Sequence, residues 1–197
     1  MSIGLSTWFP NRIAFWLFII IFILWAASEL FNTLWFRRYK NDRKIQTDRG
    51  SYWIIWLVIW ISFILSFIIR TNNLGVFHNY LQYLGLLISR LGICLRQWAV
   101  LLLGRGYTVT ILIDSDLKLV KHGPYHWLRH PSYTGSILSL VGFPVAMGTW
   151  FAGVLVLILS LASYYYRAKN EEKALLEAFG QEYRDYMQHT WRFFPGT

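Results

Sequence analysis

Two short polar groups interrupt the long apolar stretches of this chain, and they carry most of the residue types that can do chemistry. The first, residues 122–135, reads HGPYHWLRHPSYTG. The second follows the next apolar stretch, where Glu171 and Glu172 come four and five residues after Arg167. Carboxylates accept hydrogen bonds and arginine donates them in a planar fork. Together the two groups are typical of a site for a polar or charged ligand.

The three histidines of the first group recur every four residues, at His122, His126 and His130. On one continuous helix they would share a face and could bind a metal ion. Pro124 and Pro131 argue against such a helix, because proline breaks helix interiors and moves the preceding residue out of the helical region. The whole chain has only five histidines, few for a membrane di-iron enzyme. We therefore expect no metal site.

The first group is expected to form a loop, a helical turn and the start of a helix. Pro131 suits the first turn of a helix, and the free N–H groups at such an end attract anions. The polar groups would then meet at one face of the membrane. A simpler interpretation stays open, in which Arg129 and Arg167 contact lipid phosphate and the two acids only pair with them.

The pattern GPYxxxRHPxYxG resembles the signature of the isoprenylcysteine carboxyl methyltransferase family. It is carried by Gly123-Pro124-Tyr125, Arg129-His130-Pro131, Tyr133 and Gly135. About 35 residues later the family has an arginine, a Glu-Glu pair and a Phe-Gly-x-x-Tyr-x-x-Tyr run, matched here by Arg167, Glu171-Glu172, Phe179-Gly180, Tyr183 and Tyr186. The similarity covers roughly residues 118–195, and the two N-terminal spans carry no part of it.

The resemblance implies S-adenosylmethionine as methyl donor, with S-adenosylhomocysteine as product, and a prenylated cysteine or similar lipid-like molecule as acceptor. It implies that the cofactor is bound by His122, Gly123, Pro124, Tyr125, Leu128, Arg129, His130, Tyr133, Arg167, Glu171 and Glu172. The catalytic residues implied are Arg129, Glu172 and Arg192, with His189 as the alternative to Arg192 in the tail. Which of the two glutamates contacts the cofactor is left open.

The acceptor decides what the site must supply. A carboxylate is ionised at neutral pH and needs no general base, so alignment and exclusion of water become the main tasks. A lipid amine must first be deprotonated, for which Glu172 or His130 would serve. An amine N-methyltransferase is therefore the second hypothesis, and a sterol-type reductase using NADPH is the third. A membrane scaffold or transporter is the non-enzyme alternative, although no internal repeat favours transport.

Four long apolar stretches, at residues 13–36, 52–69, 80–103 and 136–166, predict an all-α integral membrane protein. A span needs about 20 apolar residues, and the last stretch is long enough for a helical hairpin that turns near residues 147–149. Five spans are predicted, and four with a re-entrant or kinked segment is the alternative. Arg90 and Arg96 in the third span either face inward or reach an interface.

The basic residues favour five spans. Fifteen of the 19 lysines and arginines lie in residues 37–49, 104–129 and 167–192, and cytoplasmic loops are enriched in such residues. Five spans place all three regions in the cytoplasm, with the N-terminus outside and the cofactor site and C-terminus inside. The net charge of +9 then reflects topology and attraction to anionic lipid, and we expect no binding of nucleic acid.

The predicted organisation is a single membrane domain over residues 1–197. Residues 1–70 form two N-terminal spans, and residues 71–197 form a catalytic core with spans three to five. Within this core the cofactor loop is residues 118–135, C-terminal helices cover 167–190, and a short strand or hairpin is expected within 107–125. The sequence does not indicate an oligomeric state.

Overall fold

The structure is a computed structural model that describes residues 5–37, 50–78, 80–104 and 119–196. Most of the predicted strand or hairpin lies outside these residues, as does nearly all of the basic segment 37–49. The described residues form helices and only two isolated β-bridges. The prediction of an all-α membrane protein is confirmed.

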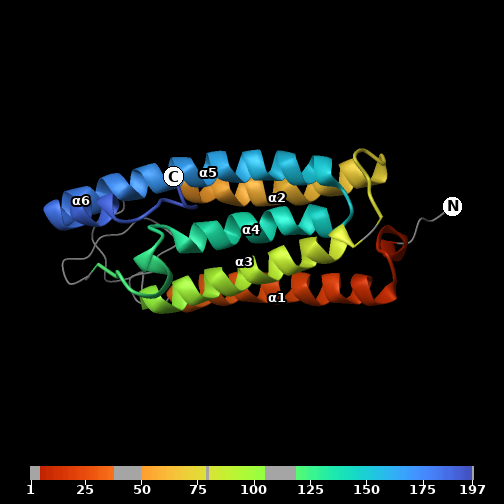
Figure 1. Cartoon of the computed structure of the whole chain (residues 1–197), viewed down its shortest axis with the longest axis horizontal. Coiled ribbons are helices and arrows are strands. Elements are labelled where there is room, and N and C mark those ends of the chain that lie inside the picture. Colours follow the sequence, from red (N-terminus) through yellow and green to blue (C-terminus); the bar gives the residue numbers. More distant parts are fainter. Residues whose placement is uncertain (1–4, 38–49, 79, 105–118, 197) are drawn as a thin grey trace.

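Five helices lie along one elongated bundle (Figure 1). They are α1 Arg12–Arg37, α2 Gly50–Thr71, α3 Leu81–Leu103, α4 Pro131–Ala146 and α5 Trp150–Phe179. Short 3-10 turns, η1 Leu5–Trp8 and η3 Gly123–His126, precede α1 and α4, and the short helix α6 Gln181–Gln188 follows α5. The last apolar stretch therefore turns where it was predicted to, between Ala146 and Trp150.

Helix α4 is the central helix, and it is short. Its 16 residues span about 24 Å at 1.5 Å per residue, less than the ~30 Å of a hydrocarbon core. The other four long helices are each long and apolar enough to cross a membrane. The five-helix bundle is thus established, while the number of complete crossings stays a prediction.

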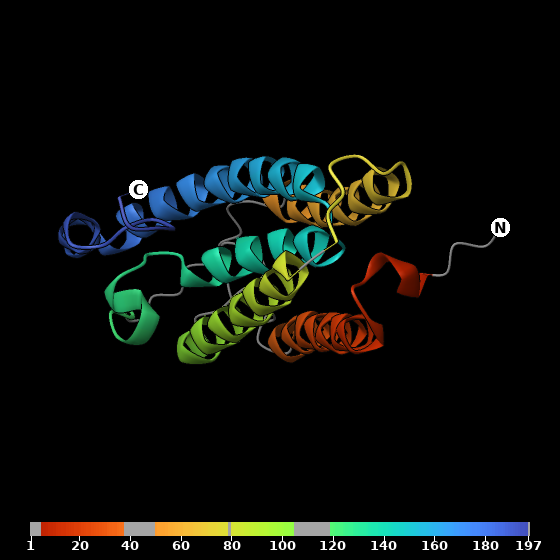
Figure 2. The ribbon, with the colours of Figure 1, turned by 45° about the vertical axis from the view of Figure 1, so that its right-hand side comes forward.

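Glycines let α3 and α4 pack backbone against backbone, side by side in both ribbon views (Figures 1 and 2). A Cβ atom on Gly92 of α3 would lie 2.5 Å from the Ser139 nitrogen, and one on Gly135 of α4 would lie 2.6 Å from the Arg96 nitrogen. Close approach through small residues is typical of membrane helix pairs, where lipid supplies no hydrophobic driving force. This contact fixes the N-terminus of α4, where the first polar group begins.

An aromatic cluster joins α1, α2 and α4 in the middle of the bundle. Phe143, only 1% exposed, lies with its ring centroid 5.6 Å from Phe63 and 5.8 Å from Trp25. The Trp25 contact is edge-to-face and the Phe63 contact is tilted, and aromatic pairs of this kind stabilise a core beyond the burial of apolar area. The cluster attaches the N-terminal helices to α4, although they carry no part of the sequence signature.

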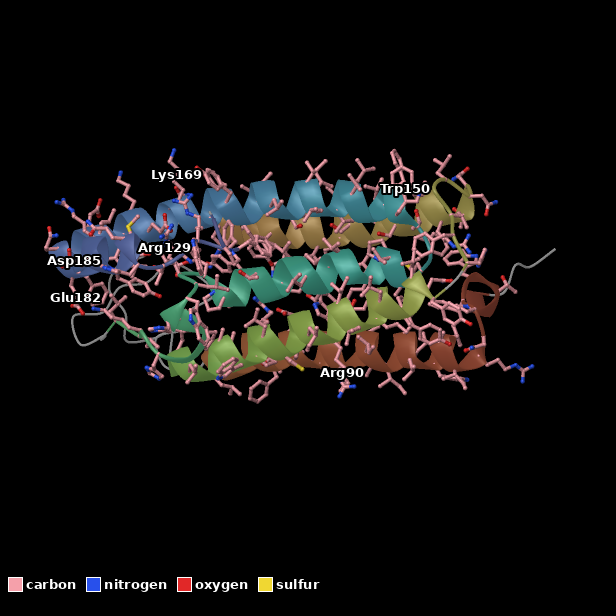
Figure 3. All side chains as sticks on the ribbon, viewed as in Figure 1. Arg90, Arg129, Trp150, Lys169, Glu182 and Asp185 are labelled. Atoms are coloured by element: carbon pink, nitrogen blue, oxygen red, sulfur yellow. The ribbon has the colours of Figure 1, made fainter. Side chains whose placement is uncertain are left out.

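The two arginines of α3 face opposite ways. Arg96 points into the bundle, where Nη2 donates to Glu29 Oε2 at 2.8 Å and Nη1 donates to Ser136 Oγ at 2.7 Å. Arg90 is exposed on the outer face (Figure 3). An inward role is thus confirmed for Arg96 and is wrong for Arg90.

Candidate active site

The two polar groups meet at the end of the bundle where α4 begins and α5 ends (Figure 1). Arg129 and Lys169 lie at this end, and Trp150 lies at the other (Figure 3). Arg129 Nε donates to Glu172 Oε1 at 2.9 Å, which joins the loop directly to α5. The segment after α6 contacts both, so three parts of the chain converge here.

The loop takes its shape from Gly123 and Pro124. Gly123 has φ +62°, and a Cβ atom there would lie 2.6 Å from Leu102 Cδ1 of α3. Glycine is the residue that tolerates this backbone without strain. Pro124 lies in the first turn of η3, and Tyr186 of α6 donates from its hydroxyl to the Tyr125 carbonyl at 2.6 Å. The loop is therefore held between α3 and α6.

Backbone hydrogen bonds attach the C-terminal tail to the loop. The Trp191 nitrogen donates to the Trp127 carbonyl at 3.0 Å, the Arg129 nitrogen to the Trp191 carbonyl at 2.7 Å, and the His130 nitrogen to the Arg192 carbonyl at 3.1 Å. Thr134 Oγ1 adds a bond of 2.8 Å to the Phe193 carbonyl. This pairing carries the Arg192 side chain to Glu172.

Glu172 is the centre of the cluster. Its side chain is 5% exposed. Arg192 donates from Nη2 to Oε2 at 2.6 Å, and His130 Nε2 lies 3.3 Å from Oε1. A buried carboxylate needs such charge-assisted partners, since an unpaired charge there would be very costly. With Arg129 included, three basic side chains surround this one acid.

Arg129 links Glu172 to the end of α6. Its Nη1 donates to the Met187 carbonyl at 3.0 Å and to the Thr190 carbonyl. These carbonyls belong to the last turn of the helix and the residues after it, where backbone acceptors lack helical partners. The Arg129 side chain therefore ties α5 to the end of α6 and holds the site together.

Glu171 stands at the more open side of the cluster. Its side chain is 30% exposed. It accepts a hydrogen bond of 2.6 Å from the Tyr133 hydroxyl, and Arg167 Nε donates to that hydroxyl at 2.8 Å. The rings of Tyr133 and His130 are stacked, with centroids 5.2 Å apart. Glu171 is thus oriented by its neighbours and still reachable.

Tyr183 contributes a buried hydroxyl that the sequence did not single out for the site. The residue is 1% exposed, and its hydroxyl has no hydrogen-bond partner among the described residues. Burial raises the pKa of Tyr183, and the charges of Glu172 and Glu171 act in the same direction. Tyr183 is therefore a neutral, buried donor without a partner among the described residues, in the electric field of the two acids.

The neighbours of Arg192 in the tail keep this side chain positively charged. The hydrogen bond to Glu172 raises the pKa of Arg192 above its ordinary value, and this effect outweighs burial. The Arg192 guanidinium also lies 4.9 Å from the centre of the Tyr165 ring, on the exposed face of α5. Arg192 therefore stays cationic between the buried acid and the outer surface of the bundle.

The predicted site residues divide into two sets. The cluster brings together Arg129, His130, Tyr133, Arg167, Glu171, Glu172 and Arg192. His122 is exposed, while Pro124, Tyr125 and Leu128 shape the loop behind the cluster. His189 is exposed and contacts the Asp185 carbonyl, so Arg192 is the tail residue beside the acids.

The comparisons with known proteins point to one family. The model of the isoprenylcysteine carboxyl methyltransferase (ICMT) family matches residues 83–177. A probable protein-S-isoprenylcysteine O-methyltransferase of Oryza sativa subsp. indica is 32% identical over 118 residues, which are 59% of this chain and 62% of that protein. The uncharacterized protein YpbQ of Bacillus subtilis is 28% identical over 83% of this chain and 97% of its own length.

A solved structure agrees with these matches. The eukaryotic intramembrane Ras methyltransferase ICMT has a TM-score of 0.56 to this chain at 28% identity, over 76% of this chain and 54% of the other. The chain thus spans about half the length of that enzyme and about three fifths of the rice relative. In its fold, its converging polar groups and its sequence, the chain is thus similar to the isoprenylcysteine carboxyl methyltransferase family.

Proposed function

We propose that the protein transfers a methyl group from S-adenosylmethionine to the α-carboxylate of a prenylated cysteine or a similar lipid-like acid. The observation that carries this proposal is the contact between the Arg129–His130 turn and the Glu171–Glu172 pair at one end of a membrane bundle. Relatives named as isoprenylcysteine O-methyltransferases support the same activity. S-adenosylmethionine supplies an activated methyl group, and the chain supplies binding and alignment.

The residues present fit that cofactor. It carries hydroxyl and amino donors together with a carboxylate acceptor. Glu171 is a partly exposed carboxylate that can accept from the donors, and the Tyr183 hydroxyl is a buried donor without a partner among the described residues. We assign Glu171 the cofactor contact, because the hydrogen bonds of Arg129 and Arg192 already engage both oxygens of Glu172.

Glu172 then acts as a positioning residue. It holds Arg129 and Arg192 in place, and the pairing of opposite charges in a buried site is strong enough to fix both side chains. Arg192 is next to the exposed Tyr165, so its positive charge favours an anionic acceptor that approaches from the lipid. Since a carboxylate is already ionised at neutral pH, none of these residues has to remove a proton from it.

The direct test is methyl transfer by the purified protein in nanodiscs. Labelled S-adenosylmethionine is supplied with N-acetyl-S-farnesylcysteine, with the amide of that compound, or with an aminophospholipid. Transfer to the first compound alone is expected. Transfer to the aminophospholipid alone would assign an amine acceptor and overturn the proposed substrate. If the protein bound a reduced nicotinamide nucleotide and did not bind S-adenosylhomocysteine, the proposal of methyl transfer would be wrong.

The role of Glu171 has its own test, with a matched control on the same helix. Glu171→Gln keeps the shape of the side chain and removes its charge, so we expect affinity for S-adenosylhomocysteine to fall about tenfold or more, as for a lost charge-assisted hydrogen bond of roughly 1.5–3 kcal/mol. Glu177→Gln changes an exposed residue of α5 and should bind as the wild type does. Equal affinity for all three proteins would contradict the assignment.

We further propose that this end of the bundle faces the cytoplasm. The described tail contains Arg167, Lys169, Lys173, Arg184 and Arg192 at the same end as Lys121 and Arg129. Cytoplasmic segments are enriched in basic residues, and the cofactor would then enter from the aqueous side. Cysteines introduced at Lys169 and Arg12 should react with an impermeant reagent from opposite sides. Labelling of both from one side would exclude this topology.

A further inference from the structure

A polar pocket lies between η1 and the last turn of α2. These two elements are at the end of the bundle opposite to the start of α4 (Figure 1). Its volume is about 350 Å³, and it is lined by Thr7, Trp8, Phe67, Arg70, Thr71, Asn73 and His78. The chain reverses after α2 at Asn73, which has φ +56°. This turn places Asn73 and His78 beside the end of the Arg70 side chain.

Arg70 is the charged group of this pocket. The residue is 3% exposed. Its Nε donates to the Met147 carbonyl at 2.8 Å, its Nη2 lies 3.2 Å from His78 Nε2, and its guanidinium lies 5.4 Å from the centre of the Trp8 ring. A guanidinium can only donate, so His78 must accept at Nε2 through an unprotonated nitrogen. These partners are all neutral.

The pocket has a positive charge without a described counter-charge. Within the part of the chain that the structure describes, no carboxylate lies within ion-pair distance of Arg70, whereas Arg96, Arg129 and Arg192 each contact a glutamate. Burying an arginine without an anion is costly. An oxyanion bound in the pocket would supply the missing negative charge.

The hydrogen bonds that remain open also suit an oxyanion. A guanidinium has five N–H donors, and the contacts to Met147, Asn73 and His78 engage one donor on each nitrogen. Two donors are left, one on each terminal nitrogen, and they could serve two oxygens of a phosphate. The Nε bond to Met147 and the contact with the Trp8 ring hold the guanidinium in place.

The walls of the pocket are apolar on one side. Trp8 and Phe67 lie with ring centroids 5.3 Å apart, and Phe67 is 49% exposed on the outer face of α2. A free ion would gain nothing from this surface, whereas the glycerol and first acyl carbons of a lipid would bury apolar area against it. Aromatic side chains at the ends of membrane helices commonly take this place.

We propose that this pocket is a phosphate-binding site whose natural ligand is a membrane phospholipid, held by Arg70 through its phosphate and by Trp8 and Phe67 through its glycerol and upper acyl region. The site is separate from the Arg129–Glu172 cluster and independent of the proposed methyl transfer. If the phospholipid site were disproved, the proposal of methyl transfer would still stand. If methyl transfer were disproved, the phospholipid site would still stand.

The test measures thermal stability of the purified full chain in a neutral detergent. Three probes are titrated: dioctanoyl phosphatidylglycerol, dioctanoylglycerol, which lacks the phosphate, and sodium phosphate. The variant His78→Glu places a carboxylate beside Arg70 and keeps the Arg70 bond to Met147. Its control is Arg12→Gln, which lowers the net charge by the same one unit at an exposed residue outside the pocket.

We expect stabilisation by the phospholipid at a concentration at least tenfold below that needed for sodium phosphate, and none by dioctanoylglycerol. His78→Glu should weaken the phospholipid response at least tenfold, and Arg12→Gln should keep it. The phospholipid and sodium phosphate could instead reach half of their stabilising effect at the same concentration, with both effects lost in His78→Glu. This result would support a phosphate site but assign it to the free ion. An equal response to dioctanoylglycerol, an unchanged His78→Glu, or an equal loss in Arg12→Gln would overturn the site.

Discussion

Replacing Arg129 by alanine is the most informative single change, because this side chain joins three parts of the chain. It donates to Glu172 of α5 and to the Met187 and Thr190 carbonyls at the end of α6. The substitution leaves two backbone acceptors without their donor and a buried acid with one partner fewer. Removing one member of a buried charge pair costs about 3–5 kcal/mol.

The loss will be smaller than the sum of the bonds, because Arg192 and His130 still contact Glu172. We therefore expect Arg129→Ala to lower the free energy of unfolding by about 3 kcal/mol, at the low end of that range. The binding free energy of S-adenosylhomocysteine should fall by more than the free energy of unfolding. The reason is that Glu171 is adjacent to Glu172 and its position depends on that residue.

Two measurements separate these effects. Unfolding in mixed micelles gives the free energy, and calorimetry at a temperature where the variant is folded gives the affinity for S-adenosylhomocysteine. Arg184→Ala is the matched control, since Arg184 is an exposed arginine of α6 and should change neither value. If Arg129→Ala unfolds and binds as the wild type does, the cluster does not organise this end of the bundle and the site has been misplaced.

Two further predictions concern the packing that places the cluster. Gly142→Ala puts a Cβ atom against the Ser89 backbone nitrogen and Oγ. The free energy of unfolding should therefore fall by about 1–3 kcal/mol, as for other overpacked cores. A stability equal to the wild type would mean that α3 and α4 are further apart than described. Glu29→Gln should cost roughly 3 kcal/mol by leaving Arg96 without its acid. The pair Glu29→Met and Arg96→Met together should be more stable than Glu29→Gln alone, and a double variant that is less stable would show that the ion pair is needed for the fold itself.

The sequence predicted the elements of the fold because each depends on local chemistry. Long apolar stretches produced the helices, and the length of the last stretch correctly placed a turn near residues 147–149, between α4 and α5. The direction of each arginine in α3 was open, although a signal was present. Gly85, Ser89, Gly92 and Arg96 share one face at spacings of three and four residues, and small side chains mark the face of a membrane helix that packs closely. Arg90 is off that face.

The convergence of the site was harder to predict, because it rests on contacts between distant parts of the chain. Nothing in the local pattern around Glu172 indicates that Arg129 lies beside it, and only the family resemblance joined the two groups. The pairing of the tail with the loop uses backbone atoms at Trp127, Arg129 and Trp191, which leave no trace in residue types. Sequence alone therefore left Arg192 and His189 as alternatives, and the backbone pairing placed Arg192 beside the acids.

The different lengths of α4 and α5 shape the site. Helix α4 spans only about 24 Å, whereas α5 runs on for 30 residues and carries Glu171 and Glu172 beside the loop that precedes α4. The tail after α6 pairs with the same loop. Under the proposed function, an acceptor anchored by a lipid chain would keep its polar end at the membrane boundary. A cluster at the end of the membrane helices would contact that end without drawing the chain out of the lipid, whereas a site on a separate soluble domain would have to extract it.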